Sequence, residues 1–459
     1  MERNFIKEGE KDIKEIWRRI RKKDFSGNTG LAVKNSMYQF STNFVAKIGS
    51  LIFTIILARL LMPELFGLYS LALSTILIFS AISELGIGMT LVRFVSRELG
   101  KINKKKAKAY TFYLGKIKLI LIVISAFLLL ISAKLISNNF YQKPIFLALL
   151  AGVLYIIFIQ IFGFLQSLFQ VSNYFRGLFH KEIVFQISRL ILVPLAVLFA
   201  LRYTISNEQT LFYIILMLAV SYLFTALFMF FIFTKKIDFI KGQKTKLTKR
   251  QNKETNKFLL ATATFILSGL FFSYIDKIML GRFVAAEFIG YYSVAFSLIG
   301  ALTSLMGFGI VLLPIFSRLK RKQLELALKK SIKIIFFLGL VLFFGTLFLA
   351  PFAILIVYGV SYSPAINILR ILSLLLILLP LIGIYTSYFL SKGKPQTVAK
   401  LLIFATVINV FLNYILITSL MKYGDLAAVY GAGIATLISQ FFYMTGLMIS
   451  RKKGNKKQS

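Results

Sequence analysis

The sequence contains no cysteine and only one histidine, His180, in 459 residues. Without cysteine the chain forms neither disulfide bonds nor thiolate metal sites, and one histidine does not assemble a zinc or haem site alone. Acidic residues are also scarce, since 17 Asp and Glu stand against 55 Lys and Arg for a formal net charge of +38. We therefore expect no metal centre and no bound cofactor.

Sequence patterns typical of catalysis are missing as well. No pair of acids stands with a partner base, no Ser–His arrangement is present, and no Walker-type glycine-rich loop precedes a helix. The glycine pairs Gly86–Gly88 and Gly431–Gly433 are interpreted as helix-packing glycines. We predict that the chain is not an enzyme and that it is not by itself an ATP-driven pump.

Apolar residues, in contrast, make up 58% of the chain. They form segments of about 20 residues or more, long enough to cross the hydrocarbon core of a bilayer. The basic residues lie in short blocks between these segments, which indicates membrane topology and not binding to nucleic acid. The twelve predicted spans are residues 34–60, 65–92, 111–135, 144–169, 182–202, 210–234, 258–281, 288–315, 332–358, 364–391, 396–420 and 428–450.

The distribution of Lys and Arg predicts the orientation. Cytoplasmic loops of membrane proteins carry an excess of these residues, and here every second loop is crowded with them. Both termini are therefore expected in the cytoplasm, and the protein is expected to be a multi-pass protein of the cell membrane. The predicted division is a basic amphipathic N-terminal segment 1–33, an N-lobe 34–234, a basic linker 235–257, a C-lobe 258–450 and a basic tail 451–459.

One segment of the sequence occurs twice. Residues 59–74 and 282–297 share an Arg, a Glu, a Gly, a Tyr and two Ser, each 223 residues apart. Shared membrane composition would repeat Leu and Ile, so the matches indicate two homologous halves. Six spans per half make both halves enter the membrane in the same direction. The predicted fold is thus all-α, with two six-helix lobes related by a pseudo-two-fold axis along the membrane normal.

A polar stripe marks the first span. Gln39, Asn43, Lys47 and Ser50 are spaced so that they share one face of a helix. Lys47 falls near mid-membrane, where a cation is costly unless it serves a cavity or a partner. We predict that the stripe lines a substrate cavity, and the alternative is that its small polar residues only permit close helix packing.

Other charges inside the spans are Glu84, Arg189, Asp276 and Arg370. Arg189 and Arg370 are further candidates for substrate binding, and Asp276 and Glu84 are candidates for binding a coupling ion. Two alternatives stay open. In the first, Glu84 pairs with Arg93 or Arg97 at the membrane interface. In the second, Asp276 is neutralised by its neighbour Lys277. Together with Lys47 and Lys277, four cations stand against two acids inside the spans, which favours an anionic substrate carrying phosphate or pyrophosphate.

Residues 34–450 resemble the polysaccharide-transporter branch of the multidrug/oligosaccharidyl-lipid/polysaccharide (MOP) exporter superfamily, which includes the O-antigen repeat-unit flippases. The resemblance rests on a set of short motifs: Lys34–Ser36, Ala58–Tyr69, Glu84–Ile87 with Val92-Arg93, Asp276–Arg282, Gly290–Ser293 and Tyr430–Thr436. It implies a fold like that of the MATE transporters, with two bundles forming a V, and alternating access. Relatives that flip the peptidoglycan precursor differ, since they usually have fourteen helices and several cavity arginines.

The expected function is a flippase or exporter that moves a polyprenyl-pyrophosphate-linked oligosaccharide, or a polysaccharide, across the cytoplasmic membrane. An H⁺ or Na⁺ gradient, or the membrane potential, would drive it without a cofactor. Membrane lipids surround the protein, and the glycosyltransferases and polymerase of the same pathway are its expected partners. The alternatives are a MATE-type cation-coupled drug exporter and a non-transporting membrane partner of glycan assembly.

Overall fold

The computed structural model describes residues 27–203, 205–241, 243, 245–306, 312–313, 316–317, 319 and 321–456. Most of the predicted amphipathic segment 1–33 lies outside these residues. Within them the chain is helical and has no strand. The longer helices before the linker are α2 (Gly27–Glu84), α3 (Ile87–Gly100), α4 (Lys104–Lys134), the π-helix η1 (Leu135–Tyr141), α5 (Phe146–Val171), α6 (Phe175–Arg202) and α7 (Asn207–Lys236). After the linker come α8 (Lys249–Phe283), α9 (Ala286–Leu305), α11 (Arg321–Val357), α12 (Ala365–Leu372), α13 (Leu375–Ser391), α14 (Pro395–Leu420) and α15 (Asp425–Lys456).

The described residues form eleven helical stretches long and apolar enough to cross a membrane. The first of them reverses direction at Met62, where the backbone leaves the helical region (φ 58°, ψ 170°) just before Pro63. Proline is well suited to start the second arm because the first turn of a helix does not need its N–H. The first stretch therefore spans the membrane twice, and the predicted count of twelve spans is confirmed.

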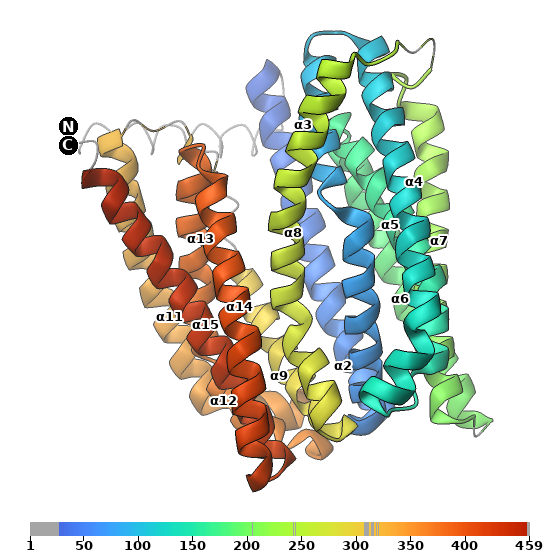
Figure 1. Cartoon of the computed structure of the whole chain (residues 1–459), viewed down its shortest axis with the longest axis vertical. Coiled ribbons are helices and arrows are strands. Elements are labelled where there is room, and N and C mark those ends of the chain that lie inside the picture. Colours follow the sequence, from blue (N-terminus) through green and yellow to red (C-terminus); the bar gives the residue numbers. More distant parts are fainter. Residues whose placement is uncertain are drawn as a thin grey trace.

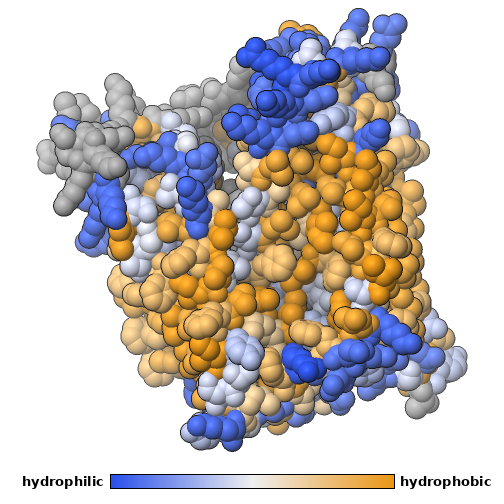
Figure 2. All heavy atoms as spheres, in the orientation of Figure 1, coloured by the Kyte–Doolittle hydropathy of each residue, from blue (hydrophilic) through white to orange (hydrophobic). Residues whose placement is uncertain are grey.

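The spans form two lobes. Helices α2 to α7 make one side of the molecule, and the helices that follow α8 make the other (Figure 1). The lobes meet at the end where α2 turns and diverge toward the end where α2 begins and α15 ends. We call these the closed end and the basic end; the latter holds Lys104–Lys106, Lys235–Lys236 and Arg451–Lys453. Figure 2 shows apolar side chains across the middle and hydrophilic ones at both ends, as a multi-pass membrane protein requires.

The second span is not one continuous helix. Residues Leu85 and Gly86 have positive φ angles of 31° and 78°, and they separate α2 from α3. A Cβ on Gly86 would lie 2.2 Å from Oγ1 of Thr262 on α8, so glycine is required both by the backbone and by the neighbour. The prediction that Gly86 is a helix-packing glycine is therefore incomplete, because its main role is to allow this break.

Helix α8 contacts both lobes. Near the basic end, Glu254 accepts a hydrogen bond from Arg97 (3.3 Å) and Asn256 accepts one from Tyr113 (2.8 Å). The guanidinium of Arg93 also lies 4.2 Å from the ring centroid of Phe258. Farther along, α8 packs against α14 and α9 of the other lobe. Any movement of the lobes relative to each other must therefore bend α8 or slide it.

Candidate functional site

Asp276 is the centre of a buried polar cluster in the second lobe. Its carboxylate accepts hydrogen bonds from Tyr292 (2.7 Å), Asn413 (2.7 Å) and Thr436 (2.5 Å), which lie on α9, α14 and α15. The residue is 4% exposed. No ion pair joins it to Lys277 in the described part of the chain, but the two charges lie within electrostatic reach of each other, so mutual neutralisation stays a prediction.

Two amide side chains near this carboxylate have oxygens that accept no hydrogen bond. Asn409 and Asn413 are one turn apart on α14, and the side-chain oxygen of each is buried without a hydrogen-bond partner. Buried acceptors without donors are costly and rare. The amide N–H groups of these residues face Asp276 and Thr436, so the amides would have to turn before their oxygens and the carboxylate could together bind a small cation. The described residues contain no group of three His, Cys, Asp or Glu residues, so amide and hydroxyl oxygens would complete such a site.

Glu84, the second candidate for ion coupling, is part of a different cluster. Its carboxylate pairs with the buried Lys118 of α4 at 2.5 Å and accepts a hydrogen bond from the amide of Gly88 (3.2 Å). Lys118 also donates to Gln160 of α5, whose amide group donates to the carbonyl of Ser80 (2.7 Å). The alternative pairing of Glu84 with Arg93 or Arg97 is therefore wrong. Every member is satisfied, so the cluster holds the helix break at Gly86 against α4 and α5.

We expect Lys118→Met to lower the free energy of unfolding by about 2 to 4 kcal/mol. The change leaves Glu84 partly buried without its ion-pair partner, which usually costs more than the intact pair contributes. Thermal or denaturant unfolding in detergent measures the effect. Lys116→Met is the matched control, because Lys116 is exposed on the same helix and its loss is expected to change stability by less than about 0.5 kcal/mol. Equal stabilities for the two variants would contradict the structural role of the cluster.

Arg189 lies half-buried between α6 and the first arm of α2. Its Nε donates to Oε1 of Gln186 (2.9 Å), and its guanidinium lies over the rings of Phe53 and Phe185, at 4.7 and 5.1 Å from their centroids. Its Nη2 is buried and has no hydrogen-bond partner. A buried guanidinium N–H without an acceptor is prepared to bind an anion.

The helix contact around Gln186 explains why Arg189 takes this position. A Cβ on Gly49 would lie 2.4 Å from Oε1 of Gln186, so only glycine lets α6 approach α2 this closely. The amide of Gln186 also donates to Glu182 (2.6 Å), and Glu182 pairs with Lys181 (2.8 Å). All three side chains are buried. Lys181 pairs with Glu182, and Glu182 also lies within electrostatic reach of Arg189, so one carboxylate serves two cations in this chain of contacts.

Three tyrosines lie near Arg189, and a fourth lies near two of them. Tyr69, Tyr155 and Tyr222 lie within electrostatic reach of its guanidinium, and Tyr274 of α8 lies within reach of Tyr155 and Tyr222. Lys277, also on α8, lies within electrostatic reach of Asp276. The region beside Arg189 is therefore rich in tyrosine hydroxyls that come from both lobes.

The polar stripe of the first span is exposed along most of its length. Asn43, Lys47 and Ser50 are exposed, Gln39 is half-buried, and Gln39 donates to Asn43 (3.0 Å). Gly49 and Phe53 face α6, and Lys47 is two residues, or about 200°, from Gly49. The structure thus places Lys47 and Arg189 on different sides of α2. The stripe and Arg189 do not form one binding group.

Arg370, the last of the candidates, lies apart from the others. It is exposed near the end of the short helix α12, where it donates to the carbonyl of Leu347 on α11 (3.3 Å) and to Asn367 (3.1 Å). No contact within the described residues links it to Arg189 or to the stripe. Its role in substrate binding stays a prediction.

Comparison with known proteins identifies the family. The model of the family described as "Polysaccharide biosynthesis protein" matches residues 32–320, which is more than half of the chain. The chain belongs to this family. No curated protein is significantly similar to it in sequence.

Solved structures agree on the fold of this polysaccharide biosynthesis protein. It is similar to the lipid II flippase MurJ in an inward closed conformation, with a TM-score of 0.66 and 19% identity over 91% of this chain and 87% of that one. It is also similar to an inward-facing MATE-family multidrug resistance transporter, with a TM-score of 0.59 and 18% identity over 93% and 96%. A eukaryotic MATE transporter matches with a TM-score of 0.57 and 14% identity over 91% and 95%. The predicted MOP-superfamily fold is confirmed.

Sequence reasoning about this family member missed most partners of the candidate residues. The Asn409–Asn413 pair is a polar one-turn spacing inside an apolar span, so it is a signal that could have been noticed. Tyr69, Tyr155 and Tyr222 gave no such signal, because isolated tyrosines are common in apolar helices. The role of Lys118 was hidden because it follows a crowded run of basic residues at the start of α4.

Proposed function

We propose that the protein moves a polyprenyl-pyrophosphate-linked oligosaccharide from the cytoplasmic to the outer leaflet of the membrane. The observation that carries the proposal is the buried Nη2 of Arg189, a guanidinium N–H without an acceptor in the middle of a membrane protein. A pyrophosphate supplies the missing acceptor and a compensating charge, and Tyr274 of the other lobe lies near the tyrosines beside Arg189. The match to the polysaccharide biosynthesis family supports a glycan as the cargo.

The exposed stripe on α2 supports a second part of the proposal. Asn43, Lys47 and Ser50 would be costly in contact with lipid tails, so we place them along a water-filled gap between the lobes. Their amide and hydroxyl groups would bind sugar hydroxyls while the lipid tail stays in the bilayer. The two lobes diverge toward the basic end in Figure 1, which is the end where this arrangement needs an entrance.

Transport requires the lobes to move as units. We propose that residues 34–234 and 258–450 are these units and that the basic linker 235–257 joins them. The excess of Lys and Arg at the basic end supports a cytoplasmic location for this end and for both termini. In that orientation the structure is open to the cytoplasm and closed to the outside, the state that accepts a substrate made inside the cell.

The return step needs an energy source, and the Asp276 cluster is the proposed coupling site. Its carboxylate and the unpartnered oxygens of Asn409 and Asn413 suit a monovalent cation such as Na⁺, and protonation of Asp276 is the alternative. Glu84 is the weaker candidate because Lys118 already neutralises it. Cation binding stabilises the conformation that forms the site, and this couples an ion gradient to the lobe movement.

Binding of the purified protein to lipid ligands tests the proposal. Native mass spectrometry compares a polyprenyl-pyrophosphate-linked disaccharide, the same polyprenol without phosphate, and a cationic drug such as ethidium. We expect the pyrophosphate ligand to bind at least about tenfold more tightly than the polyprenol, because one charge-assisted contact contributes about 1.5 to 3 kcal/mol. Equal binding of the two lipids, or preferential binding of the drug, would contradict the proposal.

A further inference from the structure

The repeated segment, Arg59–Ser74 and Arg282–Ser297, has no part in the function proposed so far. Both copies begin at the closed end, where the two lobes meet (Figure 1). The residues that the two copies share do not all lie in the hydrophobic core, since the Arg of each copy is exposed. The contacts of the two copies indicate what the repeat does.

The two arginines make equivalent contacts across the lobes. Arg59 of the first lobe donates through Nε to the carbonyl of Val357 (2.7 Å) and through Nη2 to that of Ile356, at the end of α11 in the second lobe. Arg282 of the second lobe donates through Nη1 to the carbonyls of Phe140 (2.6 Å) and Asn139 (3.1 Å) in η1 of the first lobe. Each arginine therefore binds two consecutive carbonyls at the end of the third span of the opposite half.

The glycines of the repeat bring the lobes into direct backbone contact. A Cβ on Gly67 would lie 1.8 Å from the carbonyl oxygen of Ala286, and one on Gly290 would lie 2.2 Å from that of Pro63. The second arm of α2 and helix α9 thus cross at their first turns, with one glycine from each lobe at the crossing. A larger residue at either position would push the lobes apart.

The arginine contacts are suited to repeated opening. The last carbonyls of a helix lack partners within the helix and carry partial negative charge, so they attract a cation. When the lobes separate, water can solvate both the exposed arginine and these carbonyls, so breaking the contact costs far less than exposing a buried apolar surface.

Lys143 adds a third contact of the same kind by donating to the carbonyl of Gly281 (2.7 Å). Burial lowers the pKa of Lys143, and the nearby Asp425 raises it in part.

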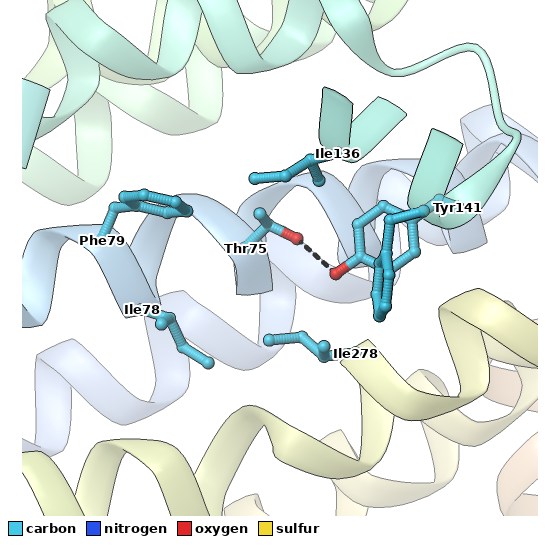
Figure 3. A pocket seen from close by; sticks show the side chains of 7 residues that line it. Thr75, Ile78, Phe79, Ile136, Tyr141 and Ile278 are labelled. Atoms are coloured by element: carbon cyan, nitrogen blue, oxygen red, sulfur yellow. Dashed lines mark hydrogen bonds between the residues drawn. The ribbon is translucent and has the colours of Figure 1, made fainter. Parts of the chain in front are cut away.

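The apolar seam beside the Arg282 contact is not completely filled. A cavity of about 170 Å³ lies there, between Thr75 of α2, Ile136 and Tyr141 of η1, and Ile278 of α8 (Figure 3). Tyr141 is held by a hydrogen bond to Thr75 (3.0 Å) within the first lobe, so this bond does not join the lobes. Apolar packing at this seam is therefore incomplete, and closure depends more strongly on the polar contacts.

We propose that the repeated segment is a two-part clamp that holds the closed end shut. Arg59 and Arg282 fasten the lobes by equivalent contacts, and both must release before the closed end opens. The inference rests on the proposed function only in assuming that this end opens during transport. It explains why Arg and Gly recur at fixed spacing while the surrounding apolar residues differ.

Distances between spin labels test the clamp. The chain has no cysteine, so Gln142→Cys and Lys422→Cys place one label on each lobe at exposed positions of the closed end. Arg59→Ala and Arg282→Ala are each expected to raise the ratio of open to closed molecules about tenfold, and the double variant more than either. Arg59→Lys and Arg282→Lys are expected to have smaller effects, because an ammonium keeps the charge without the planar fork.

Arg202→Ala is the matched control, since Arg202 is exposed at the end of α6 and makes no hydrogen bond or ion pair to the other lobe within the described residues. Distance distributions for Arg59→Ala and Arg282→Ala that match this control would overturn the clamp, and so would an effect of only one arginine. The measurement contains no lipid substrate. A clamp that responds as expected in a protein that does not move lipid-linked sugar would reject the proposed function alone.

Discussion

Asp276→Asn is expected to abolish the response of the protein to its coupling cation and to lower flipping driven by an ion gradient at least about tenfold. Asparagine has nearly the same shape as aspartate but carries no charge, so the oxygens of Asn409 and Asn413 would face a cation without a balancing carboxylate. In the unchanged protein, replacing K⁺ by Na⁺ at constant ionic strength is expected to raise the melting temperature. A cation at a hundredfold excess over its Kd stabilises by about 2.7 kcal/mol.

Asp238→Asn provides the control for the Asp276 experiment. Asp238 is exposed in the linker and pairs with Lys241 (2.8 Å), so its loss removes the same charge outside the membrane. This variant is expected to keep both the stabilisation by Na⁺ and the gradient-driven flipping. If Asp276→Asn also keeps both, the coupling site is elsewhere and the membrane potential acting on the anionic substrate becomes the better explanation.

Arg189→Ala is expected to lower flipping about 30-fold or more while the protein still inserts and folds. The variant removes the buried N–H that we assign to the pyrophosphate, and charge-assisted hydrogen bonds of this kind contribute about 1.5 to 3 kcal/mol. Arg189→Lys should recover part of the activity, because a lysine keeps the charge but not the two-pronged geometry. Flipping is measured at several substrate concentrations so that weaker binding is separated from slower movement.

Arg176→Ala is the control for Arg189, because Arg176 is exposed on the same helix near the basic end. Its removal changes the net charge equally and is expected to leave flipping within about twofold of the unchanged protein. The melting temperatures of both variants show whether either is misfolded. A folded Arg189→Ala protein with normal flipping would remove Arg189 from the substrate site.

The overall architecture was predictable because it depends on patterns that can be read directly along the sequence. Apolar length sets the spans, the alternation of basic loops sets their directions, and the repeat at Arg59 and Arg282 sets the relation of the halves. These signals add over many residues. The same reasoning located the turn at Pro63, since proline and the change from apolar to polar residues mark it locally.

The partners of the candidate residues were not predictable in the same way. Asp276 meets Asn413 and Thr436, which are 137 and 160 residues away, so the contact exists only after three helices have packed. For Glu84, the sequence offered a coupling-ion role or, as the alternative, a pair with an arginine nearby in the sequence. The break at Gly86 turns the chain, and Lys118 of α4 is the cation that lies closest. Polar contacts between spans depend on how each helix is rotated about its axis and on the angle at which two helices cross. The sequence of one segment alone determines neither.

Translocation of a labelled lipid in proteoliposomes tests the central claim most directly. A polyprenyl-pyrophosphate-linked oligosaccharide with a fluorescent sugar is placed in both leaflets, and a membrane-impermeant reductant quenches the label that it reaches. Vesicles with the protein are expected to lose nearly all fluorescence, while empty vesicles and vesicles with Arg189→Ala should lose about half during the same time. Loss of only half in vesicles with the unchanged, folded protein would contradict the claim.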